Sequence, residues 1–222
     1  GSRLSSFVKM IYCHKIRNNE AGLEEILKEK WIYAPNYLKP MISLLRGEFE
    51  LKKLNYEDAE FFFKDFLFTY KGLGFKENAR LKLFYSYYLS ENELKANQIL
   101  SKSYDEESDI NVSDKYAEEF FENARLPNRI LLKSRLLFDG GYYDQAAELL
   151  NLYPLQSYYD EEHQIEYYYR KGRIEQELDN LDIAIKTFEK CIEIQADKNY
   201  YFAPNSCLQL GFIYRDLGEK KR

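Results

Sequence analysis

The sequence is poor in the side chains that most often carry out chemistry. Its 222 residues hold three cysteines and two histidines, and Cys13, Cys191 and Cys207 show no Cys-x-x-Cys spacing. An odd number of cysteines without paired spacing argues against a disulfide framework and against a structural zinc site. His14 and His163 lie far apart in the sequence, which argues against histidine-based acid–base catalysis or metal binding. We therefore expect no metal site.

Long apolar runs and dense basic stretches are also missing. No run approaches the roughly 18 apolar residues of a membrane helix, so no span is predicted. The net charge is −5, and eight acidic residues against one lysine fall within 104–122, which leaves the remainder close to neutral. A nucleic-acid backbone needs a concentrated basic surface, so we expect no nucleic-acid partner. The opening Gly-Ser is typical of a cloning remnant, so the compartment of this soluble chain stays open between cytoplasm and periplasm.

Motifs of common enzymes and cofactor sites are absent as well. The "GLGF" at 72–75 lacks the Gly-Lys-Ser/Thr of a phosphate loop and the third glycine of a dinucleotide fingerprint. The acidic run at 105–109 lacks the turn glycine and the final glutamate of a calcium loop. Cys13 and His14 are adjacent, and neighbouring residues on a helix point about 100° apart, so they form no local nucleophile–base pair. We expect neither catalytic residues nor a cofactor.

What the sequence does contain is a repeated pattern. Four stretches join a short polar turn to a segment that bears an alanine: "LKKLNYEDAEFFF" (51–63), "YLSENELKANQIL" (88–100), "FDGGYYDQAAELL" (138–150) and "ELDNLDIAIKTFE" (177–189). A fifth, "LGFIYRDLGEKKR" (210–222), stops at its turn. The matching alanines are Ala59, Ala96, Ala146 and Ala184, with intervals of 37, 50 and 38 residues. A recurring period in this range predicts a solenoid whose units stack on one another.

Apolar residues within the copies follow the period of an α-helix. In "DIAIKTFEKCIEI" (182–194), Ile183, Ala184, Phe188 and Cys191 recur at helical spacing, which places them on one face. Alternation with a period of two is not sustained, and no Asn-Gly hairpin turn occurs, so strands are not predicted. The predicted fold class is all-α, built from helix pairs.

These residues resemble the tetratricopeptide repeat. That repeat has a small residue on its first helix, and an alanine followed by an aromatic residue on its second helix, and the same residue types recur here. The copy at 165–194 matches at Tyr168, Gly172, Leu181, Ala184, Phe188 and Cys191, the copy at 39–66 at Gly47, Tyr56, Ala59 and Phe63, and the last at Leu210, Gly211 and Tyr214. Lys171 and Glu175 depart from the pattern. The resemblance implies a right-handed superhelix (an α-solenoid) of antiparallel helix pairs. The stretches "RILLKSRLLFDGGYYDQAAELL" and "YYFAPNSCLQLGFIYRDLG" also resemble bacterial repeat proteins of unassigned function, which implies no activity.

The small residues of the pattern predict close packing between helices. Gly172, Gly211 and Ala184 allow neighbouring backbones to approach, while Phe188 and Tyr168 fill the space between layers. Cys191 and Cys207 fall on core positions of the repeat, so we expect inert, buried thiols.

We divide the chain into four segments. These are a divergent N-terminal helix pair at 1–34, two tetratricopeptide-like pairs at 35–103, a partly helical acidic insert at 104–127, and further pairs with a truncated final repeat at 128–222. The last helix lacks its partner, so we expect an exposed apolar edge there and interpret the chain as a fragment of a longer protein.

The run Tyr167–Tyr169 lies beside Arg170 and Arg173 and invites a binding interpretation. Three consecutive residues of a helix point in three directions. We expect Tyr168 in the core and Tyr167 against the neighbouring layer. The family resemblance places Tyr169 on the concave groove, where partner peptides lie.

The same resemblance, extended along the first helices, predicts nine groove residues. They are Asn128, Leu131 and Arg135, then Tyr169, Arg173 and Gln176, then Leu208, Phe212 and Arg215. Arg135 and Arg173 hold the same position in successive copies. Arginines beside aromatic rings suit acidic or polar peptides, although pairing with Glu166, Glu177 or Asp139 is the plainer interpretation.

We therefore expect a non-catalytic protein–protein interaction scaffold that binds a peptide or partner surface, acidic or polar, along its concave groove. The alternative is a structural or self-association module within a larger protein. Recognition of sugars by the tyrosines is a more distant third. The sequence leaves the oligomeric state open.

Overall fold

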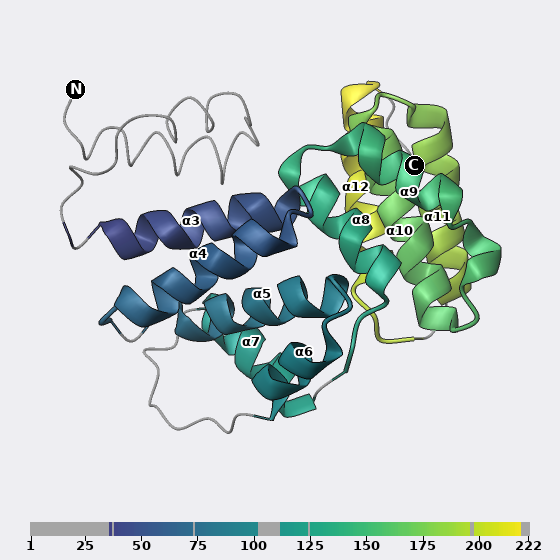
Figure 1. The fold of residues 1–222 in the computed structure, drawn as a ribbon. Coiled ribbons are helices and arrows are strands. Elements are labelled where there is room, and N and C mark those ends of the chain that lie inside the picture. The colour runs from purple at the N-terminus through teal and green to yellow at the C-terminus, as the bar shows by residue number, and fades with distance from the viewer. Residues whose placement is uncertain are drawn as a thin grey trace, which may run out of the picture. The chain divides into compact units, whose positions relative to one another are not determined.

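The computed structural model describes residues 36, 38–72, 74–101, 112–123, 125–195 and 198–218 (Figure 1). Within these ranges the chain forms helices and no strand, which confirms the all-α prediction. The predicted N-terminal pair at 1–34 and residues 104–111 of the acidic insert lie outside the described residues.

Eight of the α-helices in the described ranges form four consecutive pairs. The pairs are α3 (Lys39–Lys52) with α4 (Tyr56–Thr69), α5 (Lys76–Leu89) with α6 (Glu93–Leu100), α8 (Arg129–Gly140) with α9 (Tyr143–Leu152), and α10 (Glu161–Glu177) with α11 (Leu181–Gln195). Helix α7 (Val112–Asn123) follows the second pair, and α12 (Phe202–Asp216) follows the fourth. A short 3₁₀ turn, η3 (Leu155–Ser157), leads into α10.

The chain divides into two compact units. Unit 1 contains α3 to α7, and unit 2 contains α8 to α12 apart from residues 139–141. In unit 1, α4 packs against both α3 and α5, and in unit 2, α11 packs against both α10 and α12. The second helix of a pair therefore lies against its own first helix and the next one, as stacked repeats require. The right-handed superhelix stays a prediction.

The same turn closes the first helix of every pair. Leu54, Glu91, Gly141 and Asp179 take positive φ values of 60°, 62°, 84° and 63°. The residue after each of them donates its N–H to the carbonyl five positions earlier, as in Asn55 N to Glu50 O at 2.9 Å and Asn180 N to Glu175 O at 2.8 Å. This left-handed cap satisfies carbonyls that the end of a helix leaves without partners. Each turn thus starts the second helix in the same register.

The register places the four matching alanines in the core. Ala59, Ala96, Ala146 and Ala184 each follow the left-handed residue by five positions, and each is at most 1% exposed. Four residues after the first and last of these alanines come Phe63 and Phe188, both fully buried. The alanine positions read from the sequence are therefore buried contact points between helices.

Two of the first helices carry a glycine where the phenylalanine ring of the second helix lies. A Cβ added at Gly47 would lie 2.7 Å from Phe63 Cε1, and one at Gly172 would lie 2.6 Å from Phe188 Cε1. Real Cβ atoms do not approach rings so closely, so only glycine fits at these two positions. The predicted close approach at Gly172 is confirmed, and its partner is the aromatic ring of the same pair.

Helix α7 packs on α5 and supplies a buried carboxylate to it. The Phe120 ring lies 5.4 Å from the ring of Phe84 and 5.9 Å from that of Tyr85. Asp114 is fully buried and accepts hydrogen bonds from the backbone N–H groups of Phe75 and Asn78, at the start of α5. A carboxylate at a helix N-terminus satisfies free N–H donors and complements the helix dipole.

Two glycine-to-alanine variants, one at a packed glycine and one at an open glycine, test the packing of the glycines. Gly172→Ala forces a methyl group into the Phe188 ring and should lower the free energy of unfolding by roughly 1–3 kcal/mol. Gly211→Ala, on α12, meets no heavy atom of the described chain within 4 Å. It should raise the free energy of unfolding by about 0.5–1 kcal/mol because alanine favours helix over glycine. Thermal unfolding followed by circular dichroism measures both, and midpoint shifts of the same sign would contradict the assigned packing.

Candidate functional site

The structure separates the nine predicted groove residues into buried and accessible ones. Asn128 accepts hydrogen bonds from the N–H groups of Ile130 and Leu131, at 2.9 and 3.2 Å, so its side chain caps α8. Leu131 is fully buried. Its assignment to the groove was wrong, because a fully buried side chain cannot contact a partner.

The assignment of Tyr169 to the groove was also wrong. Its side chain is only 5% exposed, because rings from the start of α12 cover it: Tyr201 at 5.9 Å and Phe202 at 5.6 Å. Gln195 holds this connection in place by donating to Tyr200 O at 2.6 Å and accepting from Ala203 N at 2.8 Å. The rings at the start of α12 bury Tyr169, and a rule that considers one helix at a time does not include them.

The other two tyrosines also pack within unit 2. Tyr167 is 5% exposed and lies 5.4 Å from the ring of Tyr158, whereas Tyr168 is only half-buried. Tyr168 still packs against the cluster that contains Ile165 and Phe188. The tyrosine run is therefore mainly a packing element of unit 2.

The polar groove residues Arg135, Arg173 and Gln176 are partly exposed. Arg173 lies over the Phe138 ring, 4.7 Å from its centroid, and donates to Tyr169 OH at 3.3 Å. Its Nε atom and Gln176 Oε1 are buried and have no hydrogen-bond partner among the described residues. Arg135 lies close enough to Tyr201 that its charge opposes the rise that burial causes in the pKa of Tyr201. These three residues stay a predicted contact surface.

Three predicted residues lie on the exposed side of α12. Leu208 is 51% exposed and Phe212 38%, and Arg215 lies over the Phe212 ring at 5.3 Å. Cys207, on the same helix, is exposed as well, so its expected burial was wrong. Cys191 is fully buried as expected, and burial raises the pKa of its thiol to about 11.

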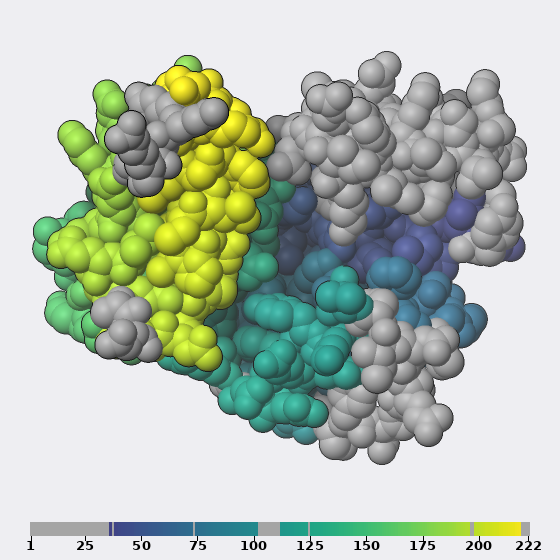
Figure 2. Space-filling view, turned by 180° about the vertical axis from the view of Figure 1, so that it is seen from behind, coloured from purple at the N-terminus to yellow at the C-terminus, as the bar shows by residue number. Residues whose placement is uncertain are grey.

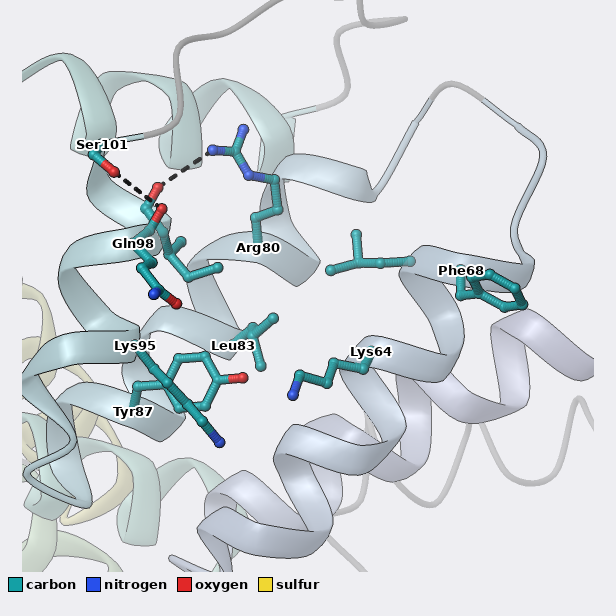
Figure 3. A pocket seen from close by; sticks show the side chains of 10 residues that line it. Lys64, Phe68, Arg80, Leu83, Tyr87, Lys95, Gln98 and Ser101 are labelled. Carbon is teal, nitrogen blue, oxygen red and sulfur yellow. Dashed lines mark hydrogen bonds between the residues drawn. The ribbon is translucent and has the colours of Figure 1, made fainter.

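A cavity that the sequence did not indicate lies in unit 1, between α4, α5 and α6 (Figure 3). Its volume is about 780 Å³, within the range of ligand pockets in proteins. The side chains of Leu67, Leu83 and Ile99 supply its apolar surface. The other lining residues are Lys64, Phe68, Arg80, Tyr87, Lys95, Gln98 and Ser101.

At one end of this cavity, three polar side chains donate hydrogen bonds to the same carboxylate oxygen of Glu60. Glu60 Oε1 accepts from Lys64 Nζ at 2.6 Å, from Lys95 Nζ at 2.9 Å and from Tyr87 OH at 3.0 Å. Both ammonium groups also lie over the Tyr87 ring, at 5.8 and 5.1 Å from its centroid. In Figure 3 the side chains of Lys64, Lys95 and Tyr87 point toward the same space. Two cations thus share one anion.

The ion pairs control the ionisation of Glu60. Burial alone would raise the pKa of this carboxyl, but the hydrogen bonds from Lys64, Lys95 and Tyr87 outweigh burial and lower the pKa below its ordinary value. The pKa of Lys64 is raised, first by its hydrogen bond to Glu60. Both groups are therefore held in their charged forms at neutral pH.

A third cation lies at the other end of the cavity (Figure 3). Arg80 pairs with Glu77 at 2.8 Å and donates to Ile99 O at 3.5 Å. Its guanidinium group lies over the Phe121 ring of α7, 5.0 Å from the centroid. Glu77 balances the charge of Arg80, so the net positive charge of the cavity lies at the lysine end, next to its apolar surface. This arrangement suits an acidic ligand with apolar neighbours.

Only one of the ion pairs of Glu60 could be predicted from the sequence. Glu60 and Lys64 are four residues apart on one helix, the spacing of a local ion pair. Tyr87 and Lys95 come from the two following helices, and no local pattern connects them to Glu60. In the described ranges, no group of three histidine, cysteine or acidic side chains is arranged to hold a metal ion. No helix in those ranges is both long and apolar enough to cross a membrane.

The lowered pKa of Glu60 predicts a pH-dependent contribution to stability. The folded pKa lies below the unfolded value, so the stabilisation is complete above the unfolded pKa and is lost as pH falls through the folded pKa. Glu60→Gln should therefore lower the free energy of unfolding by roughly 1 kcal/mol at pH 7 and by less at each step into acid. Urea unfolding at pH 7, 5 and 3 measures the difference from the unmodified chain.

The matched control is Glu193→Gln, which breaks an ion pair with Lys190 that is largely exposed to solvent. This variant should change stability little at any of the three pH values. A constant difference between Glu60→Gln and the unmodified chain from pH 7 to pH 3 would refute the assigned network.

Comparison with known proteins bears on unit 2. No match was found among curated proteins or among solved structures. Residues 165–198 match the family model of the tetratricopeptide repeat. The match covers most of α10 and all of α11, the pair in which Gly172 meets the Phe188 ring. The chain therefore carries a repeat of the tetratricopeptide family at residues 165–198.

Proposed function

We propose that this protein is a non-catalytic interaction scaffold that binds an acidic segment of a partner polypeptide in the cavity between α4, α5 and α6. The observation that carries the proposal is the pair of lysines, Lys64 and Lys95, that converge on one carboxylate beside an apolar surface. Tetratricopeptide repeats generally mediate protein–protein interaction, and residues 165–198 match that family.

The charges of the cavity favour an acidic ligand. Each ammonium group has three N–H donors, and both lysines share the single carboxylate of Glu60. An aspartate or glutamate of a partner would replace or join Glu60 and gain charge-assisted hydrogen bonds from the same two lysines. The single O–H of Tyr87 donates to Glu60 at 3.0 Å, and it would donate to a ligand carboxylate that replaces Glu60.

The apolar surface favours a polypeptide over a small anion. Leu67, Leu83 and Ile99 line the cavity, and Phe68 beside them is 82% exposed. A segment with leucine or phenylalanine next to its acidic residue would cover these side chains and remove apolar area from water. A free inorganic anion would gain only the charged contacts.

A second candidate function is a structural or self-association module, and the exposed apolar side of α12 favours it. Leu208 is 51% exposed and Phe212, four residues later, is 38% exposed. Such side chains gathered on one helix are typical of an assembly surface. Sedimentation velocity distinguishes the two functions, because self-association through α12 gives a dimer at micromolar concentration and the scaffold does not require one.

Selection from a displayed random-peptide library tests the cavity. The unmodified chain should recover peptides with an acidic residue next to leucine or phenylalanine. Lys64→Gln combined with Lys95→Gln should weaken a selected peptide about tenfold or more, because two charge-assisted hydrogen bonds are lost. Glu60→Gln should act in the opposite direction and strengthen binding, because it removes the carboxylate that competes with the ligand. Fluorescence anisotropy with the labelled peptide measures each affinity.

The matched control is Lys186→Gln combined with Lys190→Gln, which removes the same charge from α11 of unit 2. Its affinity for the selected peptide should equal that of the unmodified chain. If both double variants bind equally well, or if Glu60→Gln weakens binding, the acidic-ligand assignment fails.

A further inference from the structure

Three helices build the cavity of unit 1. Helices α4 and α6 both pack against α5, so α5 forms the floor of the cavity and α4 and α6 form its walls (Figure 3). Another side of α5 is occupied by α7, which lies in teal on the surface that faces the viewer in Figure 2. The cavity is thus a groove between two helices, with a third helix beneath it.

The side chains that line this groove follow one another at helical spacing. Starting at the end where Glu60 lies, the rows are Lys64 to Phe68 on α4, Tyr87 to Arg80 on α5, and Lys95 to Ser101 on α6. Leu83 comes four residues before Tyr87, and Ile99 comes four residues after Lys95. Four residues of a helix rise about 6 Å. A ligand should therefore present an acidic and an apolar side chain on one face, about 6 Å apart along its axis.

The groove offers few hydrogen-bond partners to the backbone of a ligand. Its floor and walls are α-helices, in which most N–H and C=O groups bond to one another. The polar side chains at the charged end are directed at a carboxylate, and Ser101 at the other end donates to Gln98 O at 3.3 Å. An extended peptide would bury its own N–H and C=O groups against Leu83 and Ile99 without partners, whereas a helix satisfies these groups internally.

The dipoles of the lining helices give a ligand helix a preferred direction. Helix α4 ends at Thr69 and α6 ends at Leu100, so the negative ends of both lie away from the charged end of the groove. The positive N-terminus of α5 lies there as well, but the carboxylate of Asp114 already caps it. The N-terminus of a ligand helix is therefore favoured at this end, and its negative C-terminus is favoured beside Lys64 and Lys95.

We infer that the ligand of the cavity is an amphipathic α-helix whose leucine or phenylalanine side chains precede its acidic residue by one helical turn. The inference rests on the proposed function, because it specifies the conformation and sequence of the acidic segment assigned to this cavity. The ligand carboxylate would accept hydrogen bonds from Lys64 and Lys95. The apolar side chains one turn earlier would pack on Ile99 and on Phe68, which is 82% exposed. The ligand helix would run antiparallel to α4 and α6.

An extended peptide is the alternative that the experiment must distinguish. Residues two apart on a strand lie on one face about 7 Å apart, so the side-chain spacing alone also fits that conformation. The two conformations differ in the backbone. A constraint that holds the helix should therefore strengthen binding in one case and abolish it in the other.

Four synthetic probes make this comparison. The first is an alanine-rich peptide of roughly 16 residues, with leucines three and four positions before a single glutamate and a hydrocarbon staple on the opposite face to hold the helix. The second lacks the staple, and the third has no staple and a proline between the leucines and the glutamate. The fourth is stapled and has its leucines three and four positions after the glutamate. Fluorescence anisotropy of the labelled probes measures their affinity for the full chain.

The affinities should follow the order of helix stability. The stapled probe should bind with a dissociation constant in the micromolar range and at least threefold more tightly than the unstapled one, because less order is lost on binding. Proline should weaken the unstapled probe at least tenfold, because it breaks the helix. The stapled probe of reversed sequence should bind about threefold more weakly than the first, because its dipole is reversed.

A variant of the chain tests where the leucines lie. Phe68→Ala removes a ring that is 82% exposed and should weaken the stapled probe at least threefold. The matched control is Phe61→Ala, on the same helix, 64% exposed and outside the cavity lining. This control should leave the affinity unchanged. Circular dichroism should show the same helix content in both variants as in the unmodified chain.

The inference and the proposed function fail in different ways. Absence of binding by the stapled probe, or tighter binding of the unstapled or proline probe, overturns the helical ligand. Peptides selected from the library that bind through Lys64 and Lys95 would then still support the scaffold. Equal affinities of the forward and reversed probes overturn the assigned direction. If the stapled probe binds the chain with Lys64→Gln and Lys95→Gln as tightly as the unmodified chain, its site is not the cavity, and the proposed function fails together with the inference.

Discussion

The contact between a glycine of one helix and a phenylalanine ring of the next governs how two of the helix pairs, α3–α4 and α10–α11, are built. At Gly47 and Gly172 the ring lies where a side chain would begin, so the two backbones approach as closely as the ring allows. The contact forms only because a left-handed turn of fixed geometry places Phe63 and Phe188 nine residues after Leu54 and Asp179. The contact therefore depends on the turn, and the buried alanines between them fill the remaining space.

Around these fixed positions the pairs differ, and the differences create the surfaces of the molecule. The α5–α6 pair has Phe84 where two other pairs have glycine, and Phe84 packs on Tyr88 and on Phe120 of α7. The helix inserted after this pair thus serves as a packing partner for α5, and its fully buried Asp114 caps that helix. On the other side of α5, between α4 and α6, the surface stays open and forms the cationic cavity.

Residues that depend on one helix or one turn could be predicted from the sequence, and residues that depend on three helices could not. The alanine register and the small residue at Gly172 follow from spacing along the chain, and both are buried contacts in the structure. Tyr169 is buried by rings at the start of α12, and the connection held by Gln195 brings those rings over it. No pattern within α10 carries that information.

The cavity escaped prediction for the same physical reason. Its polar end joins Glu60, Tyr87 and Lys95 from three different helices, and each looks like an ordinary surface residue in its own segment.

The two proposed surfaces rely on different forces, although one repeat pattern underlies both. In the cavity, Lys64 and Lys95 remain partly exposed, at 53% and 40% of their side-chain area, so salt screens their attraction for an acidic ligand. At the exposed side of α12 the contribution comes from covering Leu208 and Phe212, which salt does not screen. The first surface arises where a pair is complete and its flank is charged. The second arises on α12, where no described part of the chain covers Leu208 and Phe212. A repeat whose core needs only a few fixed positions leaves the remaining positions free to specify partners of different chemistry.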